Sequence, residues 1–158
     1  GRTKSWDVQK YLIADLSKPH ESKVKNIDYF IDLNGEYQAD ITLYGVDIIF
    51  CLEVMEYIYN PVQAIKNMWS WLEHKGILYI TFPFIYPIHN PKTEDCLRYT
   101  EYGARKLLER NGFEVLEIIP REAYGNNLSS FFAAERMRPA KDHQSHDDVA
   151  YIIKARKK

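Results

Sequence analysis

The stretch from residue 46 to residue 61, which reads VDIIFCLEVMEYIYNP, decides the fold. Its first seven residues are almost continuously apolar, as is typical of a strand that a parallel sheet covers on both faces. Asn60 and Pro61 then suit the N-cap and the first position of a helix. The stretch therefore predicts a central strand, a short connection and a helix that begins at Pro61.

Short apolar runs and longer amphipathic stretches alternate along the rest of the chain. Strands are predicted at residues 11–14, 29–31, 46–52, 76–82, 113–119 and 149–153, and helices at 61–74, 101–110 and 128–135. Thr100 is expected to cap the second helix, and Asn111-Gly112 to end it. Residues 138–148 are predicted to form a flexible loop. This order predicts a mostly parallel, doubly wound α/β sheet with helices on both faces and an antiparallel last strand.

The composition indicates one globular domain over residues 1–158. The chain has 21 Lys and Arg against 22 Asp and Glu, a net charge of −1, and is 46% hydrophobic. Nucleic acids and anionic membranes attract a basic excess, so this balance argues against both as partners. Two cysteines are too few for a disulfide framework, and no run of about 18 apolar residues occurs. We therefore expect a cytoplasmic protein. The basic cluster at residues 154–158 is predicted to be a solvated tail.

Two aspartates each follow an apolar strand. Asp15 comes directly after residues 11–14, and Asp32 directly after residues 29–31. The carboxyl ends of neighbouring parallel strands meet at one edge of a sheet, which is where ligands bind in α/β folds. One carboxylate there can accept hydrogen bonds from both hydroxyls of a ribose, and a second one can accept from an exocyclic amine. The alternative interpretation is that each aspartate caps the turn after its strand.

Several stretches in the expected order resemble class I S-adenosylmethionine-dependent methyltransferases of type 11. Residues 46–61 resemble the fourth strand of that family and the segment after it. Residues 71–83 (WLEHKGILYITFP) and 107–115 (LLERNGFEV) are similar to the entries to its fifth and sixth strands. Residues 83–89 (PFIYPIH) together with 95–100 (DCLRYT) are similar to the signature of one subgroup.

The resemblance covers about residues 11–156 and implies a Rossmann-like fold. It also implies methyl transfer from S-adenosylmethionine to a small-molecule or sugar-type metabolite. In the family, acidic residues after the second and third strands contact the ribose and the adenine of the cofactor, and the end of the fourth strand meets its methionine portion. The residues that match these positions are Asp15, then Asp32 and Leu33, then Cys51, Leu52 and Glu53.

The sequence departs from the family at two points. Tyr57 stands where the family usually has a histidine, so this position does not carry the family's usual acid–base residue. Glu56 directly precedes Tyr57 in the sequence. The Gly-x-Gly loop after the family's first strand is not found, because no two of the seven glycines are closer than nine residues. That first strand lies beside the fourth in the middle of the family's sheet. Relative to the family, the chain is therefore expected to be truncated at its N-terminal end.

Four explanations for the missing strand stay open. The sheet is rearranged, the segment before Tyr11 replaces the strand, another chain supplies it, or the strand was cut away. A second copy or a partner chain is accordingly a candidate to cover the incomplete sheet. The absent loop also supports an alternative function, a non-catalytic, methyltransferase-like binding or scaffolding domain. A dinucleotide-dependent oxidoreductase is disfavoured because it needs the same kind of glycine loop.

A loop of about thirteen residues after the strand at 76–82 carries the substrate-side candidates, because long loops in compact domains are usually functional or mobile. His89 is the predicted general base, since imidazole titrates near neutral pH. The alternative is that His89 is merely a packed or exposed loop residue. Tyr86, Tyr99 and Arg98 are predicted to line the acceptor pocket. The competing interpretation of Arg98 is an ion pair with Asp95 that fixes the loop.

Two histidines near the C-terminus lie among acidic residues. His143 and His146 neighbour Asp142, Asp147 and Asp148, an arrangement that at first resembles a metal cluster. The region has no flanking strands that would fix the geometry of metal ligands. We interpret it as a solvated loop and predict no metal site.

Overall fold

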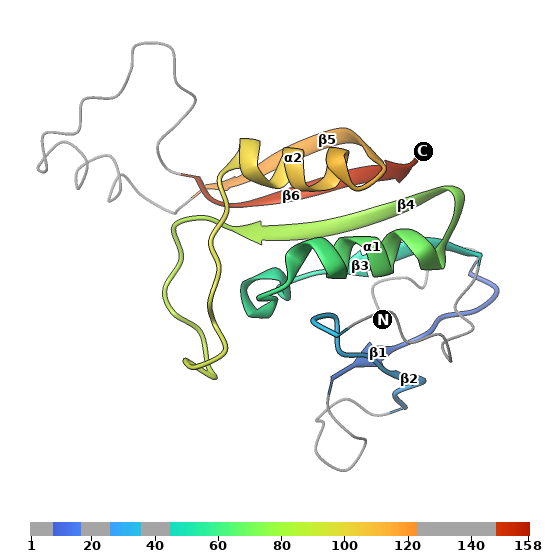
Figure 1. Ribbon diagram of the computed structural model, residues 1–158, viewed down its shortest axis with the longest axis horizontal. Helices are drawn as coiled ribbons and strands as arrows, with labels where there is room; N and C mark the ends of the chain where they lie inside the picture. Colours follow the sequence, from blue (N-terminus) through green and yellow to red (C-terminus); the bar gives the residue numbers. More distant parts are fainter. Residues whose placement is uncertain (1–7, 17–25, 36–44, 123–147) are drawn as a thin grey trace, which may run out of the picture.

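The computed structural model describes residues 8–16, 26–35, 45–122 and 148–158 (Figure 1). The elements in chain order are β1 (Ala14–Asp15), β2 (Tyr29–Phe30), β3 (Val46–Cys51), the 3-10 turn η1 (Met55–Tyr57), α1 (Pro61–Trp71), β4 (Leu72–Pro83), α2 (Glu101–Arg110), β5 (Phe113–Glu122) and β6 (Asp148–Lys157). Each of the six predicted strands and the first two predicted helices overlaps an observed element, although β1 shares only Ala14 with the strand predicted at 11–14. The helix predicted at residues 128–135 and most of the loop predicted at 138–148 lie outside the described residues.

Strands β3, β4, β6 and β5 form one sheet in that order (Figure 1). β3 and β4 are parallel, whereas β6 runs antiparallel to both β4 and β5. The prediction of parallel strands with an antiparallel last strand is therefore confirmed. β1 and β2 form a separate parallel pair, and within the described ranges no strand pairing joins β1 to β3.

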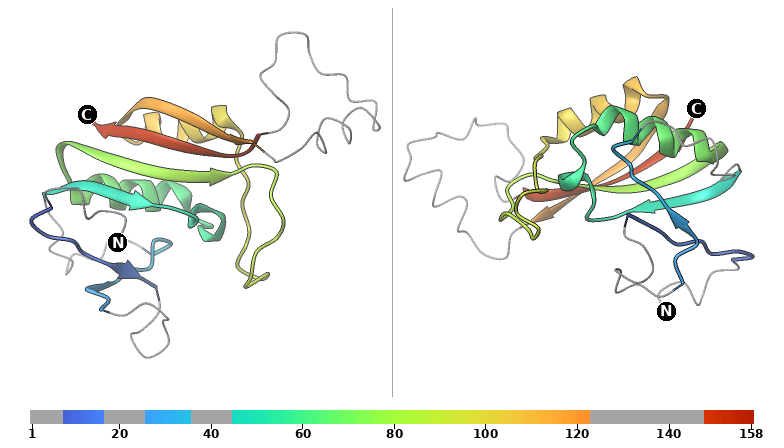
Figure 2. Two further views of the ribbon diagram at one scale, coloured as in Figure 1. Left: turned by 180° about the vertical axis from the view of Figure 1, so that it is seen from behind. Right: turned by 60° about the horizontal axis from the view of Figure 1, so that its bottom comes forward.

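Helices α1 and α2 cover the same face of the four-stranded sheet (Figure 2). The connections β3-α1-β4 and β4-α2-β5 advance in the same direction along the sheet, and right-handed crossovers in one direction place their helices on one face. Within the described ranges, both helices lie on this one face. No helix in these ranges is long and apolar enough to cross a bilayer.

The hydrophobic core lies between these helices and the sheet. Its largest fully buried apolar residues are Met55, Ile65, Met68, Leu72, Leu78, Ile80, Phe82, Leu108, Phe113 and Ile153. Alternate residues of β3 and β4 point to the opposite face, where Phe50 is 44% exposed and stacks on Tyr79 at 5.2 Å between ring centroids. Ile48 of β3 is 38% exposed on that same face.

Local signals at the helix ends are mostly confirmed. The Thr100 hydroxyl accepts a hydrogen bond from the Gly103 N–H at 3.1 Å and caps α2, and α2 ends before Asn111. Asn60 occupies the N-cap position of α1, but its side chain makes no capping hydrogen bond. α1 ends at Trp71 rather than at residue 74, because buried Leu72 already has extended backbone angles and begins β4.

The basic cluster at the C-terminus is part of the sheet, and the prediction of a solvated tail is wrong. β6 continues to Lys157, with Ala155 fully buried between charged neighbours. Arg156 pairs with Glu114 of β5 at 2.6 Å, and the Lys157 ammonium lies 3.9 Å from the centre of the Trp69 ring. At the other end of the strand, Asp148 is buried and begins β6, so it is not a loop residue.

The turn after β2 fastens the β1–β2 pair to the helical layer. Asn34 Nδ2 donates to the carbonyl of Tyr57 at 3.5 Å, and Asn34 Oδ1 accepts from the N–H of Asn60 at 3.2 Å. Asn67 Nδ2 donates to the carbonyl of Gly35 at 3.4 Å. The residues after β2 are therefore held against η1 and the beginning of α1.

Two glycines with a positive φ form a matched pair for a stability test. Gly112 has φ +90°, and a Cβ there would lie 2.6 Å from Trp69 Nε1. Gly45 has φ +78°, but a Cβ there would meet no atom within 4 Å. We expect Gly45→Ala to lower the free energy of unfolding by about 1 kcal/mol through backbone strain alone. Gly112→Ala should lower it by about 3 kcal/mol, because overpacking against Trp69 adds about 2 kcal/mol. Urea denaturation measures both, and equal losses would contradict the packing of Trp69 on Gly112.

Candidate functional site

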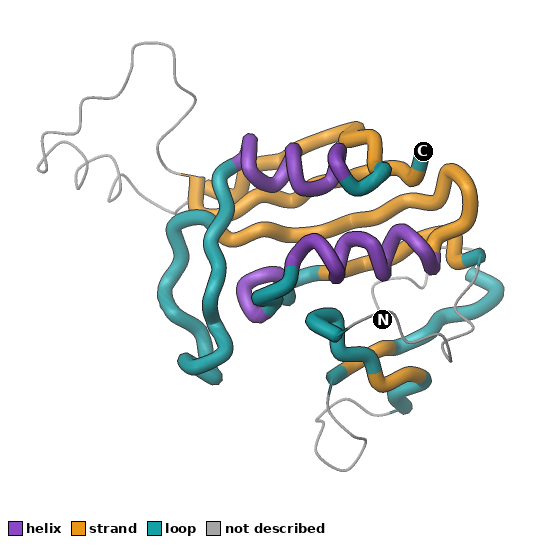
Figure 3. Tube along the Cα trace, viewed as in Figure 1, coloured by secondary structure: helices purple, strands orange, loops and turns teal. Residues whose placement is uncertain are grey.

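The loop of residues 84–100 leaves the end of β4 and returns to α2 (Figure 3). It is closed at its base, where the Tyr99 N–H donates to the carbonyl of Pro83 at 2.7 Å. Beside it, two residues after the end of β3, Glu53 has a left-handed backbone with φ +56°. Its N–H donates to the hydroxyl of buried Thr81 at 2.7 Å. A non-glycine residue in this conformation is uncommon, and this hydrogen bond helps to hold it. The carboxyl ends of β3 and β4 are thereby joined where the loop begins.

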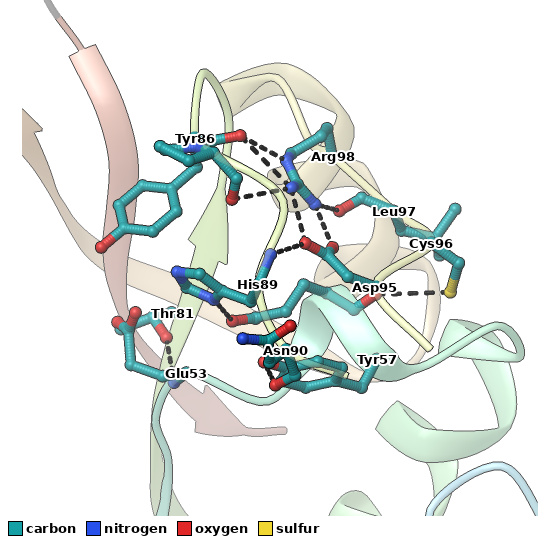
Figure 4. Close-up of polar contacts among 12 residues, drawn as sticks. Glu53, Tyr57, Thr81, Tyr86, His89, Asn90, Asp95, Cys96, Leu97 and Arg98 are labelled. Carbon is teal, nitrogen blue, oxygen red and sulfur yellow. Dashed lines mark hydrogen bonds and ion pairs between the residues drawn. The ribbon is translucent and has the colours of Figure 1, made fainter. Parts of the chain in front are cut away.

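An ion pair inside the loop fixes its shape (Figure 4). The Arg98 guanidinium donates to both carboxylate oxygens of Asp95, with Nη2 at 2.8 Å from Oδ2. It also donates to the carbonyls of Tyr86 and Pro87. The Asp95 side chain is fully buried and accepts from the N–H of His89 at 2.6 Å. The hydrogen bond from Arg98 lowers the pKa of Asp95 to about 2, and the His89 N–H acts in the same direction.

This loop brings His89 to a buried carboxylate. His89 Nδ1 lies 3.3 Å from Glu56 Oε1, and the imidazole packs edge-on against the Tyr86 ring at 4.6 Å between centroids. The His89 side chain is 31% exposed, whereas that of Glu56 is 2% exposed.

The surroundings of Glu56 keep two nearby acids protonated. Burial, and secondarily the charge of Glu56, raise the pKa of the Cys51 thiol to about 12. Burial and the charges of Glu56 and Asp95 raise the pKa of Tyr57, whose hydroxyl donates to the carbonyl of Asn90 at 3.2 Å. Neither Cys51 nor Tyr57 is therefore suited to take up a proton at neutral pH. Tyr57 instead links the turn after β2 to the loop, through its carbonyl and its hydroxyl.

The two predicted aspartates stand at the carboxyl ends of adjacent parallel strands. Asp15 is the last residue of β1 and is in register with Phe30 of β2, and Asp32 follows β2 by two residues. Asp32 Oδ1 accepts from the N–H of Asn34 at 2.9 Å, so this side chain also caps its turn. Leu33, the next residue, is partly buried against the core.

The predicted residues at the end of β3 differ in their exposure. Cys51 is buried, whereas Leu52 is 48% exposed. The Glu53 carboxylate receives a hydrogen bond from Arg121 of β5 at 2.6 Å. Arg121 comes from the opposite edge strand of the sheet, and it was not among the predicted site residues. Its local sequence gives no signal for this contact.

The three predicted acceptor-pocket residues have different positions. The Arg98 guanidinium is committed to Asp95 and to loop carbonyls, in agreement with the competing interpretation of its ion pair. The Tyr99 hydroxyl donates to the carbonyl of Met55 at 3.3 Å, and its ring packs against Phe82. Tyr86 is partly exposed beside His89.

Glu56, like Arg121, was not among the predicted site residues. The available signal in the sequence was an acidic residue within an otherwise apolar and aromatic stretch, between Met55 and Tyr57. His143, His146, Asp142 and Asp147 lie outside the described residues. In the ranges that are described, no group of three His, Cys, Asp or Glu side chains could hold a metal ion.

Comparison with solved structures identifies the fold. A methyltransferase of Mesorhizobium loti, dependent on S-adenosylmethionine, superimposes with a TM-score of 0.58 at 13% identity, over 91% of this chain and 78% of the other. A Listeria monocytogenes protein assigned to the same class has a TM-score of 0.55 at 13% identity, over 92% and 78%. The chain therefore has the Rossmann-like fold of class I methyltransferases. It matches no family model and no curated protein sequence.

Two further solved structures with this fold differ in their activity or assembly. The [4+2]-cyclase SpnF has a TM-score of 0.53 at 19% identity, over 83% of this chain and 56% of the cyclase. A Haloferax volcanii protein assigned as a methyltransferase, solved in complex with the activator Trm112, has a TM-score of 0.55 at 13% identity, over 86% and 64%. The fold alone therefore does not determine the reaction or the assembly.

The pKa of Asp95 predicts how stability depends on pH. A carboxyl with a lowered pKa stabilises the folded state above its unfolded pKa, and that contribution is lost as the pH falls through the folded pKa. We expect Asp95→Asn to lower the free energy of unfolding at pH 7 by about 2 kcal/mol, as for a lost charged hydrogen bond. The difference from the unsubstituted protein should shrink as the pH falls from about 4 to about 2. Urea denaturation over this pH range measures it, and a difference that does not change with pH would contradict the assignment.

Proposed function

We propose that this chain, which has the class I methyltransferase fold, transfers a methyl group from S-adenosylmethionine to a small-molecule or sugar-type acceptor. One observation carries the proposal. Asp15 and Asp32 stand at the carboxyl ends of adjacent parallel strands, where α/β folds bind ligands. The proposed general base, His89, stands in the loop that continues from β4.

The residues at this edge suit the chemistry of the cofactor. Ribose hydroxyls and the adenine amine are hydrogen-bond donors, and the carboxylates of Asp15 and Asp32 are acceptors. Leu33 offers apolar surface beside the second carboxylate, and residues 51–53 would meet the methionine portion. When bound, S-adenosylmethionine supplies an electrophilic methyl group on a sulfonium sulfur.

The chain's own contribution is to position the acceptor and to take up a proton. In an in-line displacement, most of the rate comes from holding the reacting atoms in the right geometry. The Asp95–Arg98 ion pair holds the backbone of His89, and the Tyr86 ring packs against its imidazole. His89 would therefore present a fixed imidazole to the acceptor, with Tyr86 beside it.

The assembly and the substrate class belong to the same proposal. A net charge of −1 supports a small-molecule acceptor over nucleic acid. We further propose that a second copy or a partner chain covers the incomplete sheet next to β3, where Ile48 and Phe50 are partly exposed. The reaction would take place in the cytoplasm.

Cofactor binding is tested by calorimetry with S-adenosylhomocysteine. Asp15→Ala should weaken binding by about 1.5–3 kcal/mol, or roughly 10- to 150-fold, because the ribose loses a charged acceptor. Glu73→Ala is the control, since Glu73 is exposed near the beginning of β4, away from the carboxyl edge. No binding heat at millimolar ligand would favour the non-catalytic binding or scaffolding domain. Unchanged affinity in Asp15→Ala would remove the ribose assignment.

The role of His89 is tested separately from cofactor binding. His89→Ala should lower the rate of methyl transfer by about 100-fold, as for the loss of a general base. Its affinity for S-adenosylhomocysteine should stay close to that of the unsubstituted protein. Transfer of a labelled methyl group to an acceptor measures the rate, and equal rates in both proteins would exclude His89 as the base.

A further inference from the structure

The Glu56 carboxylate is buried, and only one of its two oxygens has a hydrogen-bond partner among the described residues. Oε1 lies 3.3 Å from His89 Nδ1, and in the described part of the chain Oε2 has no hydrogen-bond partner. The residue is 1% exposed and lies among apolar side chains such as Met55. Burying a carboxylate is costly unless it is paired. Among the described residues, His89 is the ion-pair partner of Glu56.

The second carboxylate at this loop shows what a purely structural pair looks like. Asp95 accepts hydrogen bonds at both oxygens, from the permanently charged Arg98 and from a backbone N–H. Glu56 instead leaves one oxygen unpaired, and its partner is charged only when protonated. The partner is also open to solvent on one side, because the His89 side chain is 31% exposed. This arrangement stabilises the loop less than the Asp95–Arg98 pair does, and it provides a group that can gain a proton.

The contacts of His89 leave one ring nitrogen available. Its backbone is held by Asp95, its ring packs on Tyr86, and Nδ1 faces Glu56. Among the described residues, no hydrogen-bond partner is found for Nε2. When Glu56 is ionised, its carboxylate can only accept, so this contact favours the Nδ1–H form, in which Nε2 has a free lone pair.

We propose that Glu56 is a positioning residue that holds His89 in the Nδ1–H form, and that Nε2 takes the proton from a hydroxyl group of the methyl acceptor. The identity of the acceptor rests on the proposed methyl transfer. The hydroxyl O–H bond breaks and its proton moves to Nε2. The oxygen forms a bond to the methyl carbon, the carbon–sulfur bond breaks, and its electron pair stays on sulfur. Glu56 then stabilises the imidazolium.

A hydroxyl is the acceptor that this pair fits. A carboxylate acceptor is already ionised at neutral pH and has no proton to give. A neutral amine attacks through its own lone pair and can release its proton to water afterwards. An alcohol or a phenol must lose its proton as the new bond forms, so it gains most from a positioned base.

The tautomer of His89 tests the role of Glu56 without any substrate. Nitrogen-15 NMR of the ring nitrogens distinguishes the Nδ1–H form from the Nε2–H form, and His89→Asn identifies the signal. We expect the Nδ1–H form in the unsubstituted protein and its loss in Glu56→Leu, which removes the acceptor but keeps an apolar side chain. Glu94→Leu is the matched control, since Glu94 is exposed in the same loop and should leave the tautomer unchanged. The Nε2–H form in the unsubstituted protein would overturn the proposal, as would an unchanged tautomer in Glu56→Leu.

The acceptor class is tested with a labelled methyl group and a panel of alcohols and phenols, each with the matching amine and carboxylic acid. We expect label in hydroxyl compounds, and a rate about 100-fold lower in Glu56→Gln, which keeps the side-chain shape. The affinity for S-adenosylhomocysteine should change by less than about twofold, or 0.4 kcal/mol. Label only in amines or acids, or in no hydroxyl compound, would overturn the hydroxyl assignment. Failure of the unsubstituted protein to bind S-adenosylhomocysteine would instead refute the proposed function, whatever the tautomer.

Discussion

Strand β4 is hydrogen-bonded along both edges, in parallel to β3 and antiparallel to β6. The residues that face the helices are fully buried from Leu78 to Phe82, so the strand cannot shift by one residue without turning its core face to solvent. Pro83 is therefore held at a fixed place, and the carbonyl of this residue also closes the base of the loop. The position of the loop depends on this strand because the loop begins where β4 ends. Most other contacts of the loop residues lie within the loop or with η1.

The two buried carboxylates at the loop, those of Asp95 and Glu56, differ in how their charges are paired. Asp95 is buried but satisfied at both oxygens, so its charge stabilises the folded loop. The Glu56 carboxylate is also buried, but among the described residues its one hydrogen-bond partner is His89, which is charged only when protonated. A charge held in an apolar environment acts strongly on its neighbours, and it helps to keep Cys51 and Tyr57 protonated. The proposed acid–base chemistry is therefore assigned to the contact between Glu56 and His89.

The fold is shared by proteins with different activities, among them a [4+2]-cyclase. Function therefore has to be argued from side chains, and the site here has two parts. Asp15 and Asp32 belong to a strand pair that Asn34 fastens to η1 and α1. His89 belongs to the loop after β4. Tyr57 connects the two parts, because its carbonyl contacts Asn34 and its hydroxyl contacts Asn90. The residue that departs from the family pattern thus has an architectural role.

Much of the fold was predictable because its signals are local. The apolar run at 46–52, the Asn60-Pro61 helix start and the Thr100 cap each act within a few residues of the chain, so the sequence located β3, α1 and α2. It also identified the loop and His89. The boundary of α1 was not predictable, because the burial of Leu72 in the sheet overrides the helical pattern. The basic residues at the end of the chain suggested a solvated tail. The residues between them become buried only when β6 pairs with its neighbours in the sheet, and the local sequence does not show this pairing.

The sequence by itself determined the order of strands and helices, the two aspartates at the carboxyl ends of β1 and β2, and the candidate base. The tertiary structure decided which groups meet. Glu56 and His89 are 33 residues apart, and Glu53 and Arg121 are 68 residues apart. Neither contact has a local signature, because each depends on how β3, β4 and β5 are ordered and packed. The single face covered by α1 and α2 follows from the same ordering. Local propensities act over a few residues. The partner of a buried charge is determined by the packing of segments that are distant in the sequence, because only this packing removes the charge from water.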